Sequence, residues 1–218
     1  MPKPLAAGLE EQYPELAHAE LMSWEEEYLL QVEEQFTREK GRYVGDAFFE
    51  MMSYPLLVGD PETVLDDKYS IAISEDVAVK YFGNDWRTNP EVLGTSIKIN
   101  NGDLHKITGV FANTGANSSL QFDLLLNIEV FIEDNDWVES WGNNGLRMIV
   151  KLKEGEIDME GFGIRLMEEI NSHDIGYDSR AFLQKYSERY LYSNYDDGVL
   201  TGGRIDYVKI FFVVAIFI

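Results

Sequence analysis

Apolar positions near the N-terminus follow two different spacings. Over residues 5–18 they recur at helical spacing, which predicts a first helix. Over residues 28–36 the pattern becomes extended, as in a strand. Residues 38–41 are polar and end in glycine, so a turn is expected there, with Tyr43-Val44 beginning a partner strand. This part of the chain is therefore predicted to form a helix followed by a hairpin.

Two polar residues in the next segment are placed to begin helices. Asp60 precedes Pro61, and an acceptor side chain followed by proline is typical of a helix start. After a short apolar strand over residues 69–73, Ser74 is placed to cap a second helix. Gly83 stands where that second helix should end.

The middle of the chain alternates between apolar and polar residues as strands do. The runs 96–100 and 105–111 flank Asn101-Gly102, and Asn-Gly between alternating runs is the strongest short hairpin signal. Residues 120–128 and 146–152 are also expected to be extended.

The remaining third mixes helical and irregular patterns. Asp158 is placed to cap a helix whose apolar face spans 159–170, whereas 182–191 fits a helix or a strand equally well. Helices and hairpins without a regular strand–helix–strand rhythm indicate an α+β fold with short helices packed on mixed or antiparallel strands. Two subdomains are expected, with the crossing near 132–145, where the sequence is polar.

The last nine residues of the sequence, 210–218, are all apolar. A membrane-spanning helix needs about 20 such residues. The run fits either a buried C-terminal strand or the first part of a truncated transmembrane helix, and periodicity does not separate the two.

Charge and composition narrow the classes of function. Of the 218 residues, 39 are Asp or Glu and 18 are Lys or Arg, which gives a net charge of −21. A chain this acidic is repelled by nucleic acid and by anionic lipid, so neither is an expected partner. There is no cysteine, which excludes disulfides, thiolate metal sites and a cysteine nucleophile.

No catalytic or cofactor motif stands out. The three histidines are far apart in sequence, and the glycines do not have the spacing of a phosphate-binding loop. The acidic runs 133–136 and 196–198 lack the spaced carboxylates and distal Glu of a calcium loop, so solvated turns are expected. The sequence therefore predicts no cofactor, no metal site, no binding of ATP and no enzymatic activity.

Three sequence blocks occur in a specific order and spacing. The first spans 48–60, the second runs from 71–75 to Tyr81-Phe82-Gly83, and the third begins at 107–111. Together they resemble the MacB-like periplasmic core domain of MacB/FtsX-type ABC transporter permeases, most closely the Bacteroidetes-type members. The residues that match the family's motif, and that we expect to shape the fold, are Phe48, Phe49, Gly59, Asp60, Ser74, Tyr81, Phe82, Gly83, Gly109, Asn117, Ser118, Gln121, Phe122 and Asp123.

The resemblance implies a position between the first two transmembrane helices of a permease in a bacterial inner membrane, facing the periplasm. Residues 1–206 would then form the extracytoplasmic domain, and 207–218 the start of the membrane helix, with Tyr207 and Lys209 at the membrane boundary. Both chain ends would belong to one subdomain. The implied partners are the membrane, a second permease copy or a paired permease, and a cytoplasmic ABC ATPase.

In such a permease, ATP hydrolysis in the cytoplasm drives periplasmic conformational change, for export or mechanotransmission. A membrane-anchored envelope sensor or a peptide-binding module without transport is the alternative. An acidic hydrolase is disfavoured because no catalytic motif stands out. Weak or no self-association is expected of the isolated soluble part, ending before Ile205, because the charge of −21 opposes compact dimers.

Overall fold

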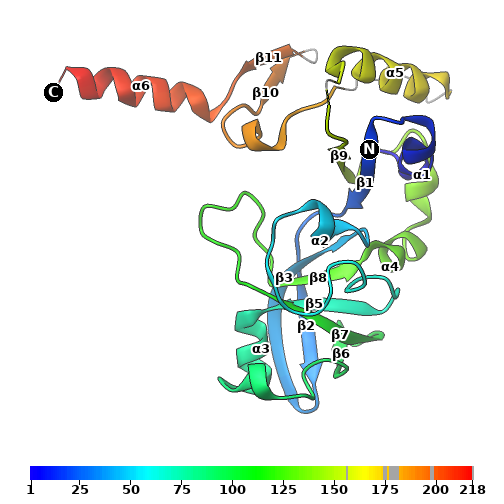
Figure 1. The fold of residues 1–218 in the computed structure, drawn as a ribbon, viewed down its shortest axis with the longest axis vertical. Coiled ribbons are helices and arrows are strands. Elements are labelled where there is room, and N and C mark those ends of the chain that lie inside the picture. Colours follow the sequence, from blue (N-terminus) through cyan, green and yellow to red (C-terminus); the bar gives the residue numbers. More distant parts are fainter. Residues whose placement is uncertain (156, 174–175, 177–181, 197–198, 218) are drawn as a thin grey trace. The chain divides into compact units, whose positions relative to one another are not determined.

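The computed structural model describes residues 1–218 except 156, 174, 175, 177–181, 197, 198 and 218. The chain forms two compact units, Met1–Lys153 and Glu154–Ile218 (Figure 1). The polar stretch 132–145 lies within the first unit. The two termini fall in different units, so the expectation that both ends share one subdomain is wrong.

The first unit combines short helices with a nine-stranded sheet. Its helices are α1 (Lys3–Gln12), α2 (Phe48–Met51), α3 (Glu75–Phe82) and α4 (Ile128–Glu133), with 3-10 turns η1 (Trp86–Thr88) and η2 (Asp136–Glu139). Its strands are β1 (Leu16–Met22), β2 (Glu26–Val32), β3 (Gln35–Val44), β4 (Leu56–Val58), β5 (Ser70–Ser74), β6 (Ser96–Ile99), β7 (Leu104–Phe111), β8 (Leu124–Asn127) and β9 (Arg147–Leu152).

Six of these strands close into a ring in the order β2-β6-β7-β5-β8-β3. Strand β3 closes it because its first part pairs with β2 and its last part, from Gly41 to Val44, runs parallel to β8. Strands β1 and β9 extend the sheet from the end of β3, where Met22 pairs with Val44. Mixed strand pairing together with these helices confirms the predicted α+β fold.

Side chains of the central strands alternate between two hydrophobic clusters. Ile71 and Ile73 of β5 join a cluster with residues of β2, β6, β7, β8 and α3, whereas Ala72 points into a second cluster with α2. Leu124 and Leu126 of β8 enter the first cluster and Leu125 enters the second. A strand buried on both faces needs apolar residues at every position, which explains the continuous apolar run in β8.

Helix α3 begins and ends where its local sequence predicts. The Ser74 hydroxyl accepts a hydrogen bond from the Val77 N–H, and Glu75 and Asp76 lie in the first turn. Carboxylates there interact favourably with the positive end of the helix dipole. Gly83 ends the helix with a φ of 77°, a backbone conformation that favours glycine. The predicted cap and stop are confirmed.

The first helix is shorter than predicted, because it ends at Gln12 and strand β1 begins at Leu16. Pro14 explains the difference. Proline lacks a backbone N–H and disfavours the helical conformation in the residue before it. Tyr13 accordingly has an extended backbone, with φ −117° and ψ 94°.

The predicted turn at 38–41 is wrong, because these residues lie inside β3. The turn is at Glu33-Glu34, where Glu33 has a φ of 52° and Val32 pairs with Gln35. Gly41 marks a close approach between strands, because a Cβ there would lie 2.3 Å from a methyl carbon of Leu124 in β8. This contact between distant parts of the chain gives Gly41 a role other than that of a turn residue.

No helix is assigned to the segment after Asp60. The Asp60 carboxylate accepts a bond from the Glu62 N–H, but only a single turn forms, closed by the Val64 N–H on the Asp60 carbonyl. The predicted cap is therefore present and the predicted helix is not. Gly59 and Val64 both lie against Gly109 of β7, which holds this short segment at both ends.

The remaining strands of the first unit lie close to their predicted positions. The hairpin of β6 and β7 is confirmed, although the residues with positive φ are Asn100 and Asn101 instead of Asn101-Gly102. The extended run expected over 120–128 forms a strand only from Leu124 to Asn127, and Asn127 then caps α4 by accepting a bond from the Glu129 N–H.

The second unit contains α5 (Met159–Ser172), η3 (Tyr186–Glu188), β10 (Asn194–Asp196), β11 (Val199–Gly202) and α6 (Arg204–Ile216). Asp158 caps α5 as predicted, accepting a bond from the Gly161 N–H. The segment 182–191 contains only the 3-10 turn η3, so it is neither of the two expected elements. Part of the acidic run 196–198 lies outside the described residues.

Helix α6 decides between the two structures left open for the C-terminal run. Residues 210–216 are helical, so the alternative of a buried strand is wrong. Within the described part of the chain, no helix combines the length and apolar character needed to cross a membrane.

Candidate functional site

Several motif residues form an aromatic cluster between α2 and the sheet. The Phe48 ring lies 5.8 Å from that of Phe49 and 6.0 Å from that of Phe122, measured between centroids. Tyr54 stacks on Phe48 at 5.9 Å and meets Phe122 edge-on at 4.9 Å. The three phenylalanines are buried, so they pack the second cluster and cannot touch a ligand from solvent.

The motif glycines Gly59 and Gly109 lie against each other. A Cβ on Gly59 would lie 3.1 Å from the Gly109 Cα, and one on Gly109 would lie 2.5 Å from a Val64 methyl group. Gly59 also has a φ of 112°, which side chains rarely adopt. Because neither glycine has a side chain, the turn after β4 packs directly against β7.

Tyr81 and its neighbours join α3 to the β2–β3 hairpin. The Tyr81 hydroxyl lies 2.9 Å from the Thr37 hydroxyl and donates to the Leu30 carbonyl at 3.1 Å. Burial raises the pKa of Tyr81, so the hydroxyl keeps its proton and remains a donor. Phe82 packs on the first hydrophobic cluster.

The motif residues 117–121 organise the loop between β7 and β8. The Gln121 amide donates to the Gly115 and Ser118 carbonyls and accepts from the Thr114 hydroxyl at 2.9 Å. The Ser118 hydroxyl lies 3.1 Å from that of Tyr54 and donates to the Leu120 carbonyl. Asn117 is exposed at the tip of this loop.

Asp123 connects three strands. Its backbone N–H donates to the Lys40 carbonyl at 2.6 Å, and its carbonyl accepts from the Ser74 N–H at 2.8 Å. Its carboxylate accepts from the Lys40 N–H at 3.3 Å. Burial raises the pKa of Asp123, and the nearby Glu39 carboxylate raises it further. Glu39 is itself buried and is paired with Lys80 at 2.8 Å.

None of the motif residues lines either of the two described pockets. Apart from the exposed Asn117, they pack a cluster, begin or end a helix, organise the β7–β8 loop or join neighbouring strands. We therefore interpret the motif as a set of contacts that determine the fold. The sequence offered no signal for the Glu39–Lys80 pair, because its members are distant in the chain and meet only through the folding of α3 against β3.

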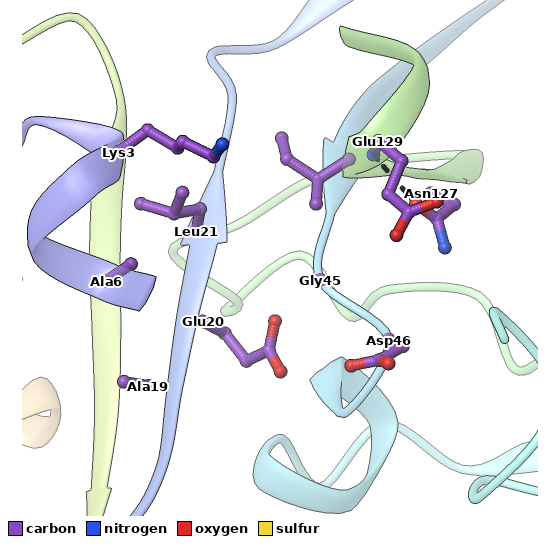
Figure 2. Close-up of a pocket in the computed structure, with 10 residues that line it drawn as sticks. Lys3, Ala6, Ala19, Glu20, Leu21, Gly45, Asp46, Asn127 and Glu129 are labelled. Atoms are coloured by element: carbon purple, nitrogen blue, oxygen red, sulfur yellow. Dashed lines mark hydrogen bonds between the residues drawn. The ribbon is translucent and has the colours of Figure 1, made fainter. Parts of the chain in front are cut away.

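A pocket of about 260 Å³ lies between α1, β1 and the segment before α2 (Figure 2). Glu20, Asp46 and Glu129 line it together with Lys3, which pairs with Glu139 at 2.6 Å. Glu20 fills the space beside Gly45 and accepts a bond from the Ala47 N–H, so this carboxylate holds a loop. Among the described residues no group of three His, Asp or Glu side chains is placed to hold a metal ion.

Helix α6 is the largest exposed apolar feature of the second unit. None of its residues is buried, and the exposed fraction reaches 71% at Phe211 and 67% at Phe212. Tyr207 is also exposed, and Lys209 pairs with Asp206 at 3.5 Å. Burying apolar side chains stabilises a protein by about 25 cal/mol per Å², so covering this helix would be favourable.

The first turn of α6 contacts Tyr190, Leu191 and Gly203. The Arg204 guanidinium lies 4.4 Å from the centroid of the Tyr190 ring, and the Ile205 N–H donates to the Leu191 carbonyl. The Asp206 carboxylate accepts from the Gly203 N–H at 3.1 Å. The sequence offers no local signal for the Arg204–Tyr190 contact, because the two residues are 14 positions apart in the chain.

One family model and several solved structures match the chain. The family model of the MacB-like periplasmic core domain matches residues 1–159. No curated protein matches the chain significantly. A domain assigned to a permease of Porphyromonas gingivalis has a similar fold, with a TM-score of 0.62, 22% identity, and coverage of 84% of this chain and 85% of that one.

Two further solved structures share the fold at lower identity. The periplasmic region of MacB from Actinobacillus actinomycetemcomitans has a TM-score of 0.60 at 13% identity, covering 82% of this chain and 76% of that one. The extracellular domain of the noncanonic ABC-type transporter YknZ from Gram-positive bacteria has a TM-score of 0.58 at 13% identity, covering 84% and 89%. At such identities the likeness establishes the fold.

Proposed function

The chain belongs to the MacB-like periplasmic core domain family of ABC transporter permeases, and we propose that it couples ATP hydrolysis in the cytoplasm to conformational change in the periplasm. The hydrolysis itself belongs to a cytoplasmic ABC ATPase subunit or domain. A second permease copy, or a paired permease, supplies the domain against which this one moves. The permease resides in the inner membrane.

The observation that carries this proposal is the anchored, exposed helix α6. We propose that residues 207–218 begin a membrane helix and that residues 1–206 form the domain outside the membrane. Tyr207 and Lys209 suit the boundary, because aromatic rings and snorkelling lysines are favoured there. The described helix has 13 residues, or about 20 Å at 1.5 Å per residue, and so would extend part of the way through a hydrocarbon core of about 30 Å.

The contacts at the start of α6 suit the transmission of movement. Arg204 stacks on Tyr190, and Gly203 leaves no room for a side chain, because a Cβ there would lie 2.4 Å from the Leu191 carbonyl. A displacement of α6 therefore moves the residues that contact its first turn, and is not absorbed by a flexible linker. A stiff joint of this kind is what a moving element needs in order to act on the rest of a domain.

Flotation with phosphatidylcholine vesicles tests the membrane assignment. Neutral lipid is chosen because the net charge of −21 opposes binding to anionic lipid. The chain is expected to float with the vesicles, and the Phe211→Asp/Phe212→Asp variant to stay in solution. Phe36→Asp/Leu104→Asp, which changes two exposed apolar side chains of the first unit, is the matched control and should float. Equal flotation of all three proteins would contradict the assignment.

Coupling is tested in the intact permease with its ATPase in proteoliposomes. The chain has no cysteine, so cysteines introduced at Thr201 and Asn117 accept spin labels selectively within it. Trapping the ATPase with ADP and vanadate should shift the distance distribution measured by pulsed EPR. Arg204→Met should reduce the shift, whereas Tyr190→Phe, which keeps the stacked ring, should preserve it. An unchanged distribution in the trapped state would favour the sensor alternative.

A further inference from the structure

The connection between β1 and β2 presents an exposed aromatic surface that the proposed function does not use. Trp24 is 40% exposed, and its indole stacks on Trp137 with centroids 6.1 Å apart. Phe131 meets both rings edge-on, at 5.3 Å and 5.9 Å. We call Trp24 and Trp137, with the carboxylates of Glu26 and Asp134, the Trp24 surface; Phe131 is buried and supports the two indole rings.

Trp24 is fixed in place although it is exposed. Ser23 beside it is buried, donates its backbone N–H to the Tyr43 carbonyl and accepts from the Tyr43 N–H through its hydroxyl, both at 2.9 Å. The Trp24 indole N–H donates to the Glu26 carboxylate at 2.5 Å. A large aromatic ring held this way loses little conformational freedom when a partner binds, which is the property of binding hot spots.

The acidic groups of the surface approach from two segments distant in sequence. Glu26 of β2 accepts the bond from the Trp24 indole, and Asp134 is the C-cap residue of α4, the helix whose Phe131 meets the Trp24 ring. Lys40 and Arg42 of β3 both form ion pairs with Glu25, at 3.3 Å and 3.4 Å. Within the described part of the chain, no lysine or arginine pairs with Glu26 or Asp134.

We propose that the Trp24 surface docks a partner protein through an arginine on an exposed segment of that partner. A guanidinium can stack on the indole face and at the same time donate hydrogen bonds to the Glu26 carboxylate. The stacking and the carboxylate together favour arginine over lysine. This inference extends the proposed function and does not depend on it.

The net charge opposes three other occupants of this surface: a second copy of the chain, nucleic acid and anionic lipid. A second copy of this chain would bring the same carboxylates and a charge of −21 to the contact. Nucleic acid and anionic lipid are repelled for the same reason. A neutral lipid surface, where tryptophan is also favoured, is the remaining competitor and forms one arm of the test.

The test uses the full chain and a Gly-Ser peptide carrying three arginines, with the matching lysine peptide as comparison. The indole N–H resonance of Trp24 should shift saturably as the arginine peptide is added, and the resonance of Trp86, which is buried, should not move. The arginine peptide should bind several-fold more tightly than the lysine peptide. This measurement needs no variant, so it does not depend on the folding of a mutant.

Variants then assign the contact. Trp24→Ala and Glu26→Gln should each weaken peptide binding about tenfold, or about 1.4 kcal/mol. Glu33→Gln/Glu34→Gln, which removes two charges from the turn at the other end of β2, should change it less than about twofold. Three results would overturn the inference: no saturable Trp24 shift up to about 1 mM peptide, equal affinity for Trp24→Ala, or a Trp24 shift caused only by phosphatidylcholine vesicles.

Discussion

Gly109 shows how a single missing side chain lets two segments meet. It lies in β7 against the turn that follows β4, where an added Cβ would lie 2.5 Å from a Val64 methyl group and 3.2 Å from the Val58 carbonyl oxygen. A larger residue must push Val64 out of a packed cluster or separate the turn from the strand. Interiors packed at crystal-like density tolerate neither change without a cost.

We therefore predict that Gly109→Ala lowers the free energy of unfolding by about 1–3 kcal/mol, because the added methyl group overpacks the site. Gly8→Ala is the matched control: its Cβ would meet only the flexible end of Gln12 within α1. Removing a glycine from a helix should stabilise by about 0.5–1 kcal/mol. Denaturant unfolding measures both, and a Gly109→Ala protein as stable as the unaltered chain would contradict the packing argument.

His105 gives the molecule a pH-dependent stability. The residue is buried beside Tyr69, and burial lowers its pKa below the ordinary value of 6.5. The unfolded chain then binds a proton more readily than the folded one, so stability falls as pH drops below about 6.5. We predict that His105→Leu has a smaller loss of unfolding midpoint between pH 7.5 and pH 5.5 than the unaltered protein. Parallel pH profiles for the two proteins would contradict this.

Single residues were predictable where their role is local. Ser74 and Gly83 act within one turn of α3, so the sequence beside them carries the signal. Gly41 was misread because its neighbour Leu124 is remote in sequence. The Trp24 surface was missed for the same reason: Trp24 and Trp137 stack only after the chain has folded.

At the scale of the element, α3 is the clearest test of a predicted boundary. Its cap, Ser74, satisfies a backbone N–H at the start of the helix, and the helix buries Val77 and Ala78 in the first cluster. We predict that Ser74→Ala lowers the free energy of unfolding by about 1 kcal/mol, and that Ser74→Gly costs only a few tenths. Equal costs for the two variants, measured by denaturant unfolding, would mean that loss of hydroxyl packing dominates over capping.

The end of α1 and the turn at Glu33-Glu34 differ in whether neighbouring residues in the sequence predict them. Pro14 is visible in the sequence, and weighing it against the helical spacing would have ended α1 before β1. The turn at Glu33-Glu34 has no comparable signal, because neither residue is a usual turn former with positive φ. Strand pairing with β2 imposes that turn, so only the folded sheet reveals it.

At the scale of the molecule, the closure of the ring could not be predicted. It depends on β3 pairing with β2 through one part and with β8 through another, and alternation in a single strand carries no information about its partners. The α+β class was predictable, because it follows from the mixture of patterns along the chain.

The net charge and the exposed apolar surface have opposite effects on the self-association of the chain. The charge of −21 opposes association at every surface, whereas α6 presents apolar side chains that gain free energy when covered. A chain ending at Arg204 keeps most of the charge and loses the apolar helix, so it should sediment as a monomer at low and at physiological salt. The full chain should associate without detergent and become monomeric when detergent covers α6. A tight dimer of the shorter chain would show that another surface holds two copies together against their repulsion, and would also remove the charge argument that excludes a second copy from the Trp24 surface.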